Sequence, residues 1–116
     1  MKNTKQQGLL RFFIYFDKKD NEYVGFCIDL GIIKCCSNPY HIERDLVEAA
    51  QGYVETVCEQ KLPDNLLNQS PPREYLDIFE SFVRTITCKQ TVQDSSINFD
   101  EARTFSKSVP ELCPAM

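Results

Sequence analysis

The sequence predicts an α+β fold: an antiparallel β-meander of three strands, one long helix packed on the sheet, then a second helix and an irregular tail. Two observations predict it. Segments rich in aromatic and β-branched residues occupy much of residues 9–36, a composition typical of strands. Two segments with apolar residues at helical spacing follow between residues 39 and 87. With 116 residues, the chain is as long as one typical domain and is able to bury a core.

The predicted strands cover residues 9–16, 23–30 and 32–36. Residues 17–22 form a polar turn, and this short connection favours an antiparallel hairpin. Gly31 interrupts the pattern before the third, shorter strand. Three consecutive strands with such short connections form a meander.

Side chains alternate between the two faces of a strand. We expect one wholly apolar face to receive the first helix; its members are Phe12, Ile14, Phe16, Val24, Phe26, Ile28 and Leu30. The opposite face is mixed and carries three aromatic residues, Phe13, Tyr15 and Tyr23, together with Asp29. Because monomers seldom expose a large apolar patch, either the chain's own second helix or C-terminal segment covers these aromatics, or another chain does.

The first helix is predicted over residues 39–60. Asn38 is placed to cap it, and Pro39 suits the first helical position, where its missing N–H has no cost. Gly52 weakens the helix interior, and we interpret it as permitting close packing. The apolar residues that recur every three or four positions are Ile42, Leu46, Ala49, Ala50, Tyr53 and Val57.

The second helix is predicted over residues 73–87, after a polar loop at 64–72. The tail holds scattered apolar residues, and Asn98 is placed to cap a short helix at 99–107. We therefore divide the chain into an α+β domain, residues 1–87, and a C-terminal extension, residues 88–116.

The chain is acidic, with 13 Lys and Arg against 17 Asp and Glu. Residues 1–38 hold six basic and four acidic side chains, whereas residues 39–116 hold seven basic and thirteen acidic ones. Without a basic cluster the chain is a poor nucleic-acid binder and favours a basic partner. No apolar run is long enough to span a membrane, and no secretory signal is present, so we expect a cytoplasmic location.

The six cysteines are irregularly spaced and include no Cys-x-x-Cys pair, so the sequence does not predict a disulfide framework or a zinc site. Cys27, Cys35 and Cys58 lie in apolar segments and are expected to be buried. Cys35 and Cys36 should point to opposite faces of their strand, which disfavours a redox switch between them.

No phosphate-binding loop and no nucleophile elbow are found. Five carboxylates could lie close enough for a metal pair, namely Asp17, Asp20, Glu22, Asp29 and Glu48. We favour turn residues for the first three and a solvated helix residue for Glu48, because turns select Asp and Asn for backbone reasons. His41 is interpreted as an exposed helix residue. We therefore expect no catalytic residue, cofactor or metal site.

Residues 12–62 resemble the HicB-like antitoxin family. The resemblance rests on the order of features: a strand, a charged turn at residues 17–22, the strand Tyr-Val-Gly-Phe-Cys-Ile-Asp-Leu at 23–30, a short third strand and a capped helix. It implies a partly degraded ribonuclease-H-like fold. It also implies a protein that is not an enzyme but binds and blocks a small basic toxin that cleaves messenger RNA.

The sequence departs from the family where Cys36-Ser37-Asn38 replaces the usual Gly-Asp-Thr/Ser turn. Many family members carry a DNA-binding segment, but residues 73–116 show no helix-turn-helix or ribbon-helix-helix pattern. DNA binding is therefore not expected here.

We hypothesise a non-enzymatic interaction module, antitoxin-like, that binds a basic toxin through Phe13, Tyr15 and Tyr23, with Asp29 as a polar contact. One alternative is a homodimer or higher oligomer that buries the same aromatic face. Another is a residual ribonuclease-H-like nuclease that uses Asp17, Asp29 and Glu48 with Mg²⁺.

Overall fold

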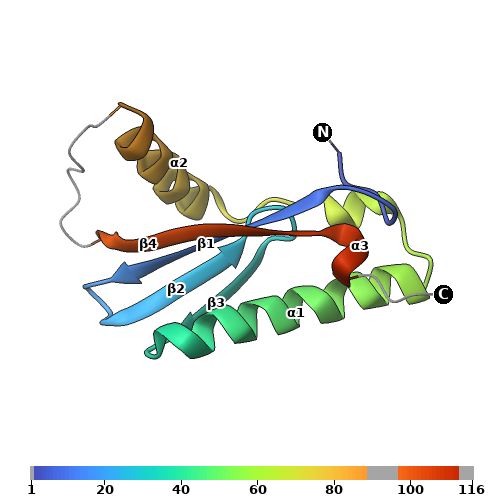
Figure 1. Cartoon of the computed structure of the whole chain (residues 1–116), viewed down its shortest axis with the longest axis horizontal. Helices are drawn as coiled ribbons and strands as arrows, with labels where there is room; N and C mark the ends of the chain where they lie inside the picture. The colour runs from blue at the N-terminus through green and yellow to red at the C-terminus, as the bar shows by residue number, and fades with distance from the viewer. Residues whose placement is uncertain (1, 89–96, 113–116) are drawn as a thin grey trace.

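A computed structural model describes residues 2–88 and 97–112 of the chain. A four-stranded antiparallel sheet of order β3-β2-β1-β4 lies between two helices, α1 on one face and α2 on the other (Figure 1). The α+β class predicted from the sequence is confirmed. The elements in chain order are β1 (Leu9–Asp17), β2 (Glu22–Cys27), β3 (Ile32–Cys36), α1 (Pro39–Glu59), the 3₁₀ helix η1 (Asp64–Leu67), α2 (Arg73–Cys88), β4 (Ile97–Ser108) and α3 (Val109–Leu112).

The turn between β1 and β2 decides which residues share a face of the sheet. It pairs Asp17 with Glu22, so that Phe13 lies opposite Phe26. Opposite residues of an antiparallel pair point to the same face, and turn length sets the register. The prediction that Phe12 and Phe26 share a face is therefore wrong. Phe26 lies on the same face as Phe13, and Cys27 lies on the same face as Phe12.

Strand β4 replaces the predicted irregular tail and the predicted helix at 99–107, and both of those predictions are wrong. It runs antiparallel to β1, with Phe105 opposite Phe12, and these two rings stack with centroids 4.7 Å apart. The pairing register shifts between Ile14 and Phe16. A shift of this kind breaks the period-two pattern by which a strand is recognised in sequence.

Helix α1 matches its prediction closely. Asn38 caps it as predicted, because its side-chain Oδ1 accepts hydrogen bonds from the backbone N–H groups of Tyr40 (2.8 Å) and His41 (3.2 Å). The helix ends at Glu59, one residue before the predicted end. Its buried side chains are Ile42, Leu46, Ala50, Val54, Val57 and Cys58, which join one core cluster with Phe12 and Ile14 of β1.

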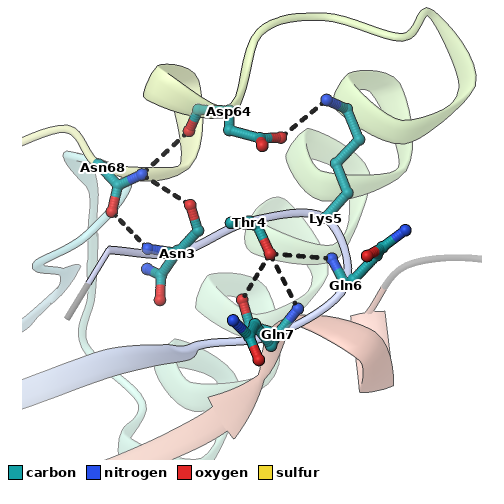
Figure 2. Close-up of polar contacts among 7 residues, drawn as sticks. All are labelled: Asn3, Thr4, Lys5, Gln6, Gln7, Asp64 and Asn68. Carbon is teal, nitrogen blue, oxygen red and sulfur yellow. Dashed lines mark hydrogen bonds and ion pairs between the residues drawn. The ribbon is translucent and has the colours of Figure 1, made fainter.

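Both ends of the described chain are tied to the α1 side of the molecule. In Figure 2 the N-terminal loop lies beside η1, and Lys5 forms an ion pair with Asp64 at 2.8 Å. Asn3 is buried and exchanges hydrogen bonds with Asn68 of 2.7 and 2.9 Å. At the other end, Val109 and Leu112 of α3 are buried in the α1-side core.

The described cysteines correct part of the sequence interpretation. Cys27 is buried and free as expected, and burial raises the pKa of its thiol to about 12. Cys35, which was expected to be buried, is exposed and free. Cys58 is buried but disulfide-bonded, so its interpretation as a plain apolar residue is wrong. The side chains that the structure describes do not include its partner.

Within residues 2–88 and 97–112, no helix combines the length and the apolar character that crossing a bilayer requires.

Candidate functional site

Two of the aromatic residues proposed for partner binding lie beneath α2. Phe13 is 0% exposed and Tyr15 is 3% exposed. The Phe13 ring contacts those of Phe79 and Phe82, with centroids 5.4 and 4.9 Å apart. Burial also raises the pKa of the Tyr15 hydroxyl. The chain's own second helix covers this part of the sheet, so a partner would have to displace α2 to reach Phe13 or Tyr15.

Tyr23 and Asp29, the other two proposed residues, lie elsewhere. Tyr23 packs on the α1 side, where its ring meets that of Phe16 at 5.0 Å. Asp29 accepts hydrogen bonds from the Arg11 backbone N–H (2.8 Å) and from its guanidinium (3.1 and 3.3 Å). The four residues therefore do not form one surface.

The carboxylates of the nuclease alternative are also separated. Asp29 binds Arg11 near the start of β1, whereas Asp17 ends that strand six residues later, about 20 Å away at the rise of a strand. Glu48 is exposed on α1. Among the residues that the structure describes, no group of three or more His, Cys, Asp or Glu side chains could hold a metal ion. These carboxylates do not make up a metal-dependent active site.

The outer face of α1 carries the strongest charge imbalance of the fold. The helix contains five carboxylates and one arginine. At about 100° per residue, four of the carboxylates lie within about 60° of Gly52 around the helix axis. They are Asp45, Glu48, Glu55 and Glu59.

Two of these carboxylates have a polar side-chain partner within the described residues. Asp45 has Arg44 at 3.7 Å, and Glu55 accepts a hydrogen bond of 3.1 Å from the Gln51 amide. In the described part of the chain, no ion pair involves Glu48, Glu55 or Glu59. The outer face of α1 is therefore a negative surface, and ion pairs within the described ranges neutralise only Asp45 of its four carboxylates.

A groove of about 500 Å³ runs beside this charge, between α1 and the segment that follows it; we name it the α1 groove. Lys61 adopts a positive φ of 52° and turns the chain back, so that Leu62 N–H donates to Val57 O at 2.9 Å. The Tyr53 hydroxyl donates to Leu66 O at 2.8 Å and fixes the far wall. The lining residues are Ala49, Gly52, Tyr53, Thr56, Val57, Leu62 and Leu66.

From the sequence, Gly52 was interpreted as permitting close packing within the chain. A Cβ built on this residue meets no atom within 4 Å, so close packing inside the chain does not explain the glycine. It lies exposed in the α1 groove instead. The sequence showed the small residues and the carboxylates, but not that Leu62 and Leu66 fold back to make a wall.

A second groove of about 460 Å³ lies between α2 and β4. Phe79 and Val83 of α2 line it, together with Thr104 and Ser106 of β4. The Arg11 guanidinium at its edge is already paired with a carboxylate, that of Asp29. The charge of Arg11 is therefore balanced within the chain, whereas the α1 groove lies beside carboxylates of α1 that form no ion pair with the described residues.

No family model matches the sequence, and searches of curated proteins and of solved structures return no significant match. We therefore infer function from the surfaces of the chain itself.

Proposed function

We propose that this chain is a non-enzymatic interaction module that binds a small basic protein. The observation that carries the proposal is the outer face of α1, where four carboxylates lie within about 60° of Gly52 and three of them form no ion pair with the described residues. Such a surface raises the association rate of a basic partner and repels nucleic acid, whose phosphates carry the same charge.

The resemblance to HicB-like antitoxins makes the proposal more specific. A three-strand meander followed by a helix that Asn38 caps is the order of features on which the resemblance rests. On this proposal the fold is a partly degraded ribonuclease-H-like module. The partner is a toxin that cleaves messenger RNA, and the chain acts in the cytoplasm, where that RNA is translated.

The burial of Phe13 and Tyr15 is a reason to expect the interface on α1 instead of on the sheet. Phe13 and Tyr15 are sealed under α2, so a partner or a second copy would have to disrupt the aromatic core to reach them. The outer face of α1 is accessible as the chain stands, and binding there costs no core contact. We therefore assign recognition to α1 rather than to the sheet.

The test is coexpression with the product of a short, basic reading frame next to the gene. We expect a complex that survives gel filtration at low salt, weakens as salt rises and raises the thermal midpoint of this chain. Messenger-RNA cleavage by the partner should stop when this chain is added in equal amount. Absence of a complex at low salt, with an unchanged midpoint, would refute the proposal.

A further inference from the structure

We infer that the α1 groove is where the partner binds, and that its occupant is an amphipathic α-helix whose apolar stripe is bordered by lysine or arginine along one edge. This inference rests on the proposed function and adds the site and the kind of element that fills it.

Gly52 is the first step. Glycine inside a helix costs about 1 kcal/mol relative to alanine, and among residues 2–88 and 97–112 no atom lies within 4 Å of its Cβ position to offset that cost. Glycine is also the residue that allows a second backbone to approach closely. Ala49 and Thr56 lie one turn to either side of Gly52. The strip of α1 that these three residues form along the groove therefore carries only small side chains. A helix is able to lie against it.

The distribution of charge around the groove gives the orientation of that helix. Asp45 and Glu59 are fourteen residues apart, which is about 21 Å along the helix axis. Glu48 and Glu55 lie on the side of Gly52 away from Tyr53, whereas Leu62 and Leu66 lie on the Tyr53 side. The groove therefore has one acidic border and one apolar wall. An element that fills it needs basic residues on one edge over about four turns and aliphatic residues beside them.

Other occupants fit this geometry less well. A second copy of the chain would bring the same acidic face against Glu48 and Glu55, and like charges at an interface disfavour association. A peptide that binds by strand addition would need an open sheet edge, whereas the α1 groove is bounded by a helix and by the loop at Leu62. A basic amphipathic helix satisfies both the apolar wall and the acidic border.

The test uses a synthetic helical peptide that carries an alanine and leucine stripe with lysines along one edge. Binding to the full chain is measured by calorimetry at low and at physiological salt. We expect saturable binding that weakens with salt. Gly52→Leu, which fills the groove, and the double variant Glu48→Gln with Glu59→Gln should each weaken it about tenfold, a loss of about 1.4 kcal/mol.

The matched control is Glu74→Gln, which removes an exposed carboxylate from α2. It should change affinity less than about twofold, since Glu74 lies outside the groove. Gly52→Leu should keep the wild-type circular dichroism spectrum because its side chain enters open space. A peptide with glutamates in place of the lysines should not bind.

The outcomes separate the inference from the proposed function. If the coexpressed partner forms a complex whose affinity is unchanged by Gly52→Leu and by the double carboxylate variant, the groove assignment is wrong and the interaction module stands. If no such complex forms, the proposed function fails. Absence of peptide binding to the wild-type chain at low salt, or an equal effect of Glu74→Gln, would overturn the groove assignment directly.

Discussion

The two faces of the sheet are covered by different means. On the α1 side, aliphatic side chains such as Leu46 and Val54 form the core, and loop hydrogen bonds from Asn3 hold the periphery. On the α2 side, aromatic rings dominate, with Phe13 in contact with Phe26, Phe79 and other rings. Because this chain covers the central strands on both sides, the proposed binding of a basic partner is assigned to the outer surface of a covering helix.

Those outer surfaces also differ. In α2, Arg73 forms ion pairs with Asp77 (3.0 Å) and with Glu80 (3.7 Å), so the helix neutralises much of its own charge. In α1, Glu48 and Glu59 form no ion pair within the described residues. A helix that only covers a core has no need to concentrate one sign of charge, so the contrast points to a role for α1 beyond packing.

The largest expected effect concerns the aromatic face. Phe13→Ala should lower the free energy of unfolding by about 3–5 kcal/mol, because it empties a fully buried site among four rings. Urea denaturation measures the change. Val83→Ala, at a position of α2 that is 41% exposed, should cost less than about 1 kcal/mol. A similar cost for the two variants would show that ring packing does not hold α2.

The second-largest change in the free energy of unfolding is expected at the polar contacts of Asn3, on the α1 side of the molecule. Asn3→Ala should cost about 2–3 kcal/mol, because it leaves Leu9 N–H and Leu67 O without the bonds of 2.9 and 3.0 Å that Asn3 makes. Gln6→Ala, at an exposed position in the same loop, should stay within about 0.5 kcal/mol of the wild type. If thermal and urea unfolding showed no difference between these variants, the loop would not contribute to the α1-side core.

Alkaline pH tests how well α2 shields Tyr15 from water. Burial raises the pKa of Tyr15 in the folded chain above its unfolded value of about 10. The folded state then binds more protons than the unfolded state, so stability falls as pH rises above about 10, by at most about 1.4 kcal/mol per pH unit. Unfolding measured from pH 9 to 11 should show a shallower loss in Tyr15→Phe. Parallel pH profiles would mean that α2 does not shield this hydroxyl.

The smallest effect concerns the open strip of α1. Gly52→Ala should stabilise the fold by about 0.5–1 kcal/mol, since the methyl group meets no atom and alanine favours helix. Gly8→Ala should destabilise it, because φ at Gly8 is 128° and a Cβ there collides with Asn3. Thermal midpoints of the two variants should therefore move in opposite directions. Destabilisation by Gly52→Ala would indicate a packing role inside the chain.

Local signals in the sequence were sufficient to predict the two long helices. Asn38 and Pro39 marked the start of α1, and the apolar spacing that includes Ile42 and Leu46 identified its buried face. These features depend on neighbours within a few residues, which the sequence displays directly.

Pairing between distant segments was not predictable in the same way. The face of Phe26 depends on the turn register, and a change of one residue reverses it. Strand β4 was missed because its register shifts near Ile14 and because its partner, β1, lies at the other end of the chain. The α1 groove depends on the return of Leu62 and Leu66, which no local pattern specifies.

The pairing of Leu9 with Ser108 has a consequence for synthesis on the ribosome. Strand β1 leaves the exit tunnel before its second neighbour, β4, and β2, β3, α1 and α2 are made between them. Contacts between such distant segments form slowly, so the nascent chain exposes an open strand edge at β1 until β4 has been made and has paired with it.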